Sequence, residues 1–124
     1  MSRKRFVVGL ALAFMLTFSV SQVFAVWYSY NMTVPKLGGI NRTGNVTKTA
    51  FGNYLVSGTH GAGYSLNVRL EKVDNSTLSS WVSFPSGSSQ SLANSGSPSQ
   101  TVHMALKNNN LVAVQSIGQW SPDP

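Results

Sequence analysis

The stretch Tyr64-Ser-Leu-Asn-Val-Arg-Leu-Glu-Lys-Val73 decides how this chain is expected to fold. Apolar side chains occupy alternate positions along most of it, and polar or charged side chains lie between them. A period of two residues is the spacing at which a β-strand places its side chains on opposite faces of a sheet. The stretch therefore predicts a strand with one face in the core and the other, which carries Arg69 and Glu71, in solvent.

Further strands are predicted on both sides of this one, separated by turn residues. They cover residues 27–34, 46–51, 54–57, 78–84, 101–107 and 111–117. No stretch after residue 25 has apolar residues at helical spacing. Six or seven short strands without a helix predict an all-β fold in one domain, and we expect a small antiparallel β-sandwich rather than the alternative, a small barrel.

The connections between these strands are expected to be loops. Residues 36–44 contain paired glycines and other turn residues. Residues 58–63 are glycine-rich, and a flexible hairpin connection is expected because a phosphate-binding loop would require a helix directly after it. Residues 85–100 are rich in Ser and Gly and predict a flexible loop that crosses between sheets. Residues 108–110 are three asparagines, which predict the turn of a final hairpin.

The first 25 residues have the layout of a secretory signal peptide. Residues 3–5 form a cationic head, residues 6–20 are almost wholly apolar, and the segment ends in Val23-Phe-Ala25. An uncleaved anchor is the alternative, but the apolar run is shorter than the about 20 residues that a spanning helix needs. We expect cleavage after Ala25, secretion, and a mature domain of residues 26–124.

Charge and cysteine content narrow the choice of partners. The chain has a formal net charge of +6 and no cysteine. Three cations belong to the predicted signal peptide, so the mature domain would carry 6 − 3 = +3. The remaining cations are scattered, whereas nucleic-acid-binding proteins concentrate theirs, so no nucleic-acid partner is expected. A mild positive charge favours a cell-wall polymer or an anionic membrane surface.

The residues that could carry chemistry do not form a catalytic pattern. Glu71 is expected in solvent and Asp74 in a turn, so neither predicts the facing carboxylates of a glycosidase. His60 is expected in a loop and His103 on the outward face of a strand, so both are expected to be exposed or loop histidines. No Gly-x-Ser-x-Gly elbow accompanies them, and two distant histidines are too few for a typical metal site. We predict no catalytic residues, no metal and no cofactor.

Two tryptophans suggest a binding surface. Trp27 and Trp81 fall on the faces of their predicted strands opposite to the apolar side chains. Exposed aromatic rings on a sheet can stack on sugars or lie at a lipid interface. The alternative is that another strand or the long loop covers them. Together with Arg69 and Lys72, the two tryptophans are the candidate surface-binding residues.

Three groups of residues carry a resemblance. They are Tyr28-x-Tyr30-x-Met32, Arg42-Thr-Gly44 followed by Lys48-Thr49, and Ala105-Leu-Lys-Asn-Asn-Asn110 leading to Gly118-Gln-Trp-Ser-Pro-Asp123. With these, the chain resembles a family of small secreted proteins of Bacillus-type Gram-positive bacteria, catalogued as a domain of unknown function. The resemblance implies export and a β fold, and it brings no catalytic residues. In size and character the chain is also similar to lactococcin-972-type bacteriocins, which are small, cysteine-free, secreted β-sandwiches.

The resulting hypothesis is a non-enzymatic secreted β domain that acts at the bacterial cell envelope, as a bacteriocin-like or wall-binding protein. The alternative is an extracellular structural or matrix-type protein that self-associates through exposed strand edges.

Overall fold

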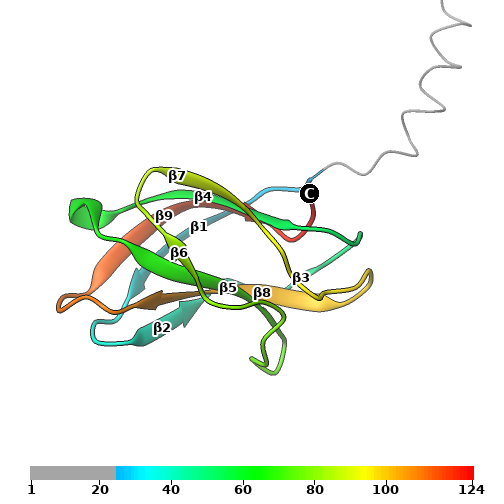
Figure 1. Ribbon diagram of the computed structural model, residues 1–124, viewed down its shortest axis with the longest axis horizontal. Coiled ribbons are helices and arrows are strands. Elements are labelled where there is room, and N and C mark those ends of the chain that lie inside the picture. The colour runs from blue at the N-terminus through cyan, green and yellow to red at the C-terminus, as the bar shows by residue number, and fades with distance from the viewer. Residues whose placement is uncertain (1–24) are drawn as a thin grey trace, which may run out of the picture.

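The computed structural model describes residues 25–124, which form a sandwich of two antiparallel β-sheets (Figure 1). The strands are β1 (Tyr28–Val34), β2 (Gly39–Arg42), β3 (Val46–Thr47), β4 (Tyr54–His60), β5 (Leu66–Lys72), β6 (Val82–Phe84), β7 (Ser88–Leu92), β8 (Thr101–Asn108) and β9 (Val114–Ser121). The all-β sandwich prediction is confirmed, although six or seven strands was too few. The predicted signal peptide, apart from Ala25, lies outside the described residues.

Each sheet is built from strands that are distant in sequence. One sheet, called sheet A here, has the order β1-β9-β4-β7, and the other, sheet B, has the order β2-β8-β5-β6 with β3 also paired to β8. Their inner faces meet in one apolar core, to which β5 contributes Leu66, Val68 and Leu70, each at most 2% exposed. The alternation predicted for this strand is therefore confirmed for these three residues, whereas Tyr64 precedes β5 and is 38% exposed.

Two predicted loops contain strands. Residues 36–44 include β2, and residues 85–100 include β7, which pairs with β4 at the edge of sheet A. Both strands are held by main-chain hydrogen bonds to one neighbour, which do not require an apolar side-chain pattern. The predicted crossing between sheets is confirmed for residues 85–100, because β6 lies in sheet B, β7 in sheet A and β8 again in sheet B.

Two predicted hairpins are wrong. β8 lies in sheet B and β9 in sheet A, so the three asparagines begin a connection between sheets. The glycine-rich residues 58–63 likewise join β4 of sheet A to β5 of sheet B through a single 3-10 turn at Gly61–Gly63. Alternation along a strand shows which side chains face the core, but it does not show which sheet the strand joins.

A chain of polar groups links the two sheets through the core. The Tyr30 hydroxyl donates to Ser116 Oγ (2.9 Å), and Ser116 Oγ donates to His60 Nδ1 (2.9 Å). His60 Nε2 donates to the carbonyl oxygen of Phe84 (2.9 Å), which can only accept. Burial lowers the pKa of His60, which favours the neutral ring that this chain requires. His60 is 5% exposed, so the prediction of an exposed loop histidine is wrong.

Two glycines lie in the same row of sheet A as Tyr30. They are Gly118 of β9 and Gly58 of β4. A Cβ at Gly58 would overlap the Tyr30 hydroxyl, and a Cβ at Gly118 would overlap the backbone of β4. Gly58 therefore leaves room for the Tyr30 hydroxyl, and Gly118 allows the backbone of β4 to approach closely.

The C-terminal residues are fixed by a buried ion pair. Residues 46–51 were predicted to be one strand, but β3 ends at Thr47 and the side chain of Lys48 turns inward and is fully buried. Lys48 Nζ lies 3.5 Å from Asp123 Oδ1 and donates to the carbonyl oxygens of Gly52 and Pro122. The Asp123 carboxylate accepts hydrogen bonds from Thr49 and Ala50. The C-terminal residues are thereby joined to the segment between β3 and β4.

Residues 25–124 contain no helix long and apolar enough to cross a lipid bilayer.

Candidate functional site

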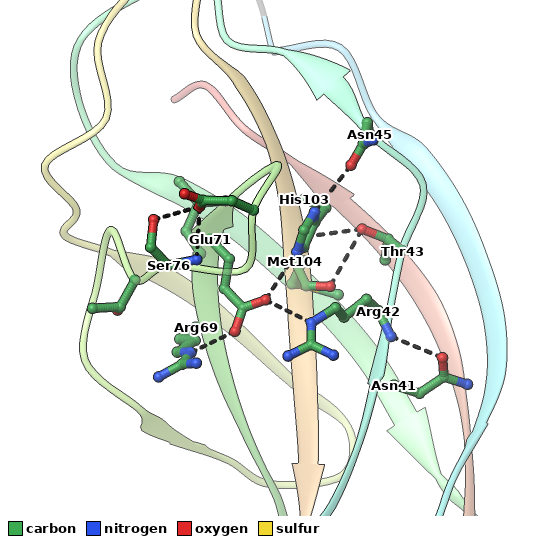
Figure 2. A network of polar contacts seen from close by, with 12 residues as sticks. Asn41, Arg42, Thr43, Asn45, Arg69, Glu71, Ser76, His103 and Met104 are labelled. Carbon is green, nitrogen blue, oxygen red and sulfur yellow. Dashed lines mark hydrogen bonds and ion pairs between the residues drawn. The ribbon is translucent and has the colours of Figure 1, made fainter.

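The outer face of sheet B carries a buried carboxylate surrounded by cations (Figure 2). Glu71 of β5 is fully buried, and its Oε1 accepts a hydrogen bond from Arg42 Nε (2.8 Å) and contacts His103 Nε2 (2.8 Å). Its Oε2 accepts from Arg69 Nε (2.7 Å). The prediction that Glu71 lies in solvent is wrong, because arginines from two strands and a histidine cover it.

The sheet register explains this convergence. Arg42 and Arg69 both pair with Ala105 of the strand between them, so the three residues form one row across β2, β8 and β5. Glu71 pairs with His103 in the neighbouring row on the same face. The small side chain of Ala105 leaves room for both arginine side chains to reach the carboxylate.

His103 is also buried, contrary to the prediction of an exposed histidine. It is 3% exposed and its Nδ1 lies 3.0 Å from Asn45 Oδ1. Alternation correctly places His103 on the outer face of β8. Its burial comes from the segment between β2 and β3, which the sequence pattern does not place over the sheet.

The cluster favours the ionised form of Glu71. Burial raises the pKa of the Glu71 carboxyl, but the hydrogen bonds from Arg42, Arg69 and His103 together lower it by more, so this pKa lies below its ordinary value. Burial also raises the pKa of Asp123, and the hydrogen bonds from Thr49 and Ala50 with the charge of Lys48 outweigh it. Both carboxylates therefore stabilise the fold while they are ionised.

These pKa directions predict a loss of stability in acid. The unfolded chain binds protons at His60 below about pH 6.5 and at Glu71 and Asp123 near pH 4, before the folded protein does. Stability is therefore expected to begin falling below about pH 6.5 because of His60, and to fall more steeply below about pH 4 because of the two carboxylates. Thermal unfolding measured from pH 8 to pH 2.5 tests this, and a constant melting temperature over that range would contradict it.

Both arginines keep part of their guanidinium groups available. Their bonds to Glu71 use Nε, and Figure 2 shows the terminal nitrogens directed away from the carboxylate. Among residues 25–124, no side chain or carbonyl accepts a hydrogen bond from these terminal nitrogens. Glu71 thus holds two arginines in place on the outer face while their terminal groups remain able to bind an anion.

Trp81 lies next to these cations. The Arg69 Cζ atom is 4.4 Å from the centroid of the Trp81 ring, and Lys107 Nζ is 5.6 Å from it. Both distances are within the range of cation–π attraction. Trp81 directly precedes β6 and is half-buried, and side chains of β5 and β8 account for part of its covering. We call Arg42, Arg69, Trp81 and Lys107 the Trp81 face.

A shallow depression of about 490 Å³ lies at the side of this face. Besides Arg69 and Trp81, its lining is rich in hydroxyl groups and consists of Thr77, Leu78, Ser79, Ser80 and Ser95. An aromatic ring beside several hydroxyls and a cation is a combination that suits a polar ligand with flat apolar patches, as a sugar ring has.

The four sequence-predicted site residues are only partly brought together. Arg69 and Trp81 are in contact, whereas Trp27 precedes β1 in the other sheet and is 44% exposed. Lys72 is exposed on the opposite face of β5 from Arg69. The sequence reasoning missed Arg42 and Lys107. Alternation predicts that Lys107 points outward from its strand, but it does not predict that this strand lies next to β5.

Other polar clusters fit structural roles. Ser116 Oγ and His60 Nδ1 are hydrogen-bonded, but Ser116 is 0% exposed, so a substrate cannot reach it in this conformation. No three His, Asp or Glu side chains within residues 25–124 are grouped as a metal site would require. That the protein is not an enzyme stays a prediction.

Comparisons with known proteins support the fold. No protein-family model and no curated protein matches the chain. A solved structure described as the crystal structure of PirA is similar to it, with a TM-score of 0.54 and 12% sequence identity. The match covers 76% of this chain and 93% of the PirA chain. At this identity the likeness extends to the fold alone.

Proposed function

We propose that this chain is a secreted, non-enzymatic protein of the bacterial cell envelope that binds an anionic wall polymer through the Trp81 face. The observation that carries this proposal is the contact of Trp81 with Arg69 and Lys107 on the outer face of sheet B. This face therefore presents a ring that can stack on a sugar next to cations that can pair with phosphate or carboxylate groups.

The arrangement suits a polymer better than a small molecule. The cations are spread over three strands, β2, β5 and β8, and the depression beside Trp81 is shallow and open to one side. A repeating anionic glycan can contact such a surface at several points, each of which contributes modestly. Because the attraction depends on exposed charges, binding is expected to weaken as salt rises.

Co-sedimentation with isolated Gram-positive cell walls tests the proposal. Residues 26–124 contain every strand of both sheets and are used for the experiment. The affinity of Trp81→Ala for walls is expected to fall about tenfold, consistent with about 1–2 kcal/mol for ring stacking and cation–π contacts. Lys107→Gln is expected to lose a smaller part of the affinity and to flatten its salt dependence.

Two variants provide matched controls. Trp27→Ala removes an exposed tryptophan outside the Trp81 face, and Lys72→Gln removes a lysine from the other side of β5. Both are expected to bind walls nearly as well as the unaltered protein. If no binding occurs at low salt, or if the controls lose as much as Trp81→Ala, the proposal is wrong.

The structural or matrix-type alternative gives a different result. Sheet A ends in β1 and β7, and sheet B ends in β2 and β6, so each sheet has edge strands that could pair with another copy. Oligomers that grow with protein concentration in light scattering, without retention on walls, would favour that alternative.

A further inference from the structure

One end of the sandwich exposes three apolar side chains on two loops. Leu37 lies between β1 and β2 and is 65% exposed, and Leu111 and Val112, between β8 and β9, are 79% and 45% exposed. Figure 1 shows both loops at the end away from the C-terminus. They are joined, because Leu37 N donates to the carbonyl oxygen of Asn110 (2.9 Å). We call Leu37, Leu111 and Val112 the apolar tip.

The apolar tip is held in shape by specific hydrogen bonds. Asn108 Nδ2 donates to the carbonyl oxygens of Val34 and Val112, and Asn108 Oδ1 accepts from Asn110. Leu37 has a φ of 58°, a left-handed backbone conformation that is uncommon for residues other than Gly, Asn or Asp. The loops therefore hold apolar side chains in solvent. At Leu37, the backbone conformation would accommodate Asn or Gly more easily.

The surroundings of the apolar tip are basic. Lys36 is exposed directly before Leu37, and Lys107 lies near the end of β8 that leads to the tip. The chain has three acidic residues, and none lies at this end. Asp74 and Asp123 follow the ends of β5 and β9 that point away from the tip, and Glu71 is buried beneath its arginines.

We propose that the apolar tip inserts into the headgroup layer of a bilayer that contains anionic lipids. The free energy falls when protruding aliphatic side chains move from water to the acyl boundary. Nearby lysines are attracted to anionic headgroups. A second copy of the chain is a poorer occupant, because apolar groups on protruding loops offer little flat area to bury between two molecules. This surface shares only Lys107 with the Trp81 face, so it is a second contact and does not depend on wall binding.

Fluorescence of an introduced tryptophan tests insertion directly. In residues 26–124, Leu111→Trp is mixed with vesicles of equal parts phosphatidylglycerol and phosphatidylcholine, and its spectrum is compared with that of the unaltered protein. The added emission is expected to shift to shorter wavelength and to be quenched by brominated lipid. Phe51→Trp is the matched control, since Phe51 is 72% exposed outside the tip, and its added emission is expected to stay unquenched.

Vesicle flotation with a second variant tests the contribution of the tip. The triple variant Leu37→Asn, Leu111→Ser, Val112→Ser introduces polar residues that suit these loop conformations. Its melting temperature is compared with that of the unaltered protein. Its binding to the anionic vesicles is expected to fall at least tenfold, while Phe51→Ser binds normally. The triple variant is expected to retain wall binding, and Trp81→Ala to retain vesicle insertion.

Two results would overturn the proposal. The first is an unquenched emission from Leu111→Trp, and the second is unchanged vesicle binding by a folded triple variant. If the unaltered protein also forms a dimer that this variant abolishes, the second result would assign the tip to a second copy.

Discussion

Replacing Lys48 with methionine is expected to lower the free energy of unfolding by about 3–5 kcal/mol, which is the loss typical of removing one partner from a buried ion pair. The Lys48 side chain is fully buried, so its removal leaves the carboxylate of Asp123 without its cation. The carbonyl oxygens of Gly52 and Pro122 also lose a donor. Because small domains are stable by only about 5–15 kcal/mol, the variant is expected to be close to unfolding at 37 °C.

Urea unfolding followed by circular dichroism measures this loss. Lys72→Met is the matched control, because Lys72 is exposed at the end of β5, and it is expected to change stability by less than about 0.5 kcal/mol. The double variant Lys48→Met, Asp123→Asn is expected to be less destabilised than the sum of the two single variants. If the two effects simply add, Lys48 and Asp123 do not stabilise each other.

Replacing Glu71 with glutamine is expected to lower the free energy of unfolding by about 2–3 kcal/mol. The substitution keeps the size of the side chain but leaves Arg42 and Arg69 without their shared anion. The side chains of Arg42 and Arg69 are 33% and 21% exposed, so water offsets part of the loss and the expected effect is smaller than at Lys48. The acid-induced fall in stability below about pH 4 should also be shallower in this variant.

Glu71→Gln has a second expected effect on wall binding. Glu71 fixes Arg69, which lies against Trp81, so its loss is expected to weaken binding under conditions in which the variant remains folded. Asp74→Asn is the control, because Asp74 is an exposed carboxylate in the turn after β5 and bonds Ser76 rather than an arginine. If folded Glu71→Gln binds walls as well as Asp74→Asn does, Glu71 does not position Arg69 for binding.

The fold class was predictable because the apolar alternation is local. Leu66, Val68 and Leu70 lie two residues apart, and each is buried as the period of two predicts. β7 was missed because it consists mainly of serine and is held in place by main-chain bonds to β4. The false final hairpin arose because Leu111 and Val112 look like strand residues although they are exposed at a loop.

The candidate site was less predictable because it depends on contacts between strands. The outward positions of Arg69 and Glu71 follow from alternation, but the burial of Glu71 depends on Arg42 of β2 and His103 of β8. Their rows are set by a register that no local pattern specifies. The same holds for Lys107, which approaches Trp81 only because β8 pairs with β5.

The position of β9 has a consequence for how the domain folds. Among the described strands β9 comes last in sequence, yet it lies between β1 and β4 and pairs with both. The first strand of sheet A therefore cannot find its partner until the last one is available. Folding is expected to be a late, all-or-none event rather than a stepwise one.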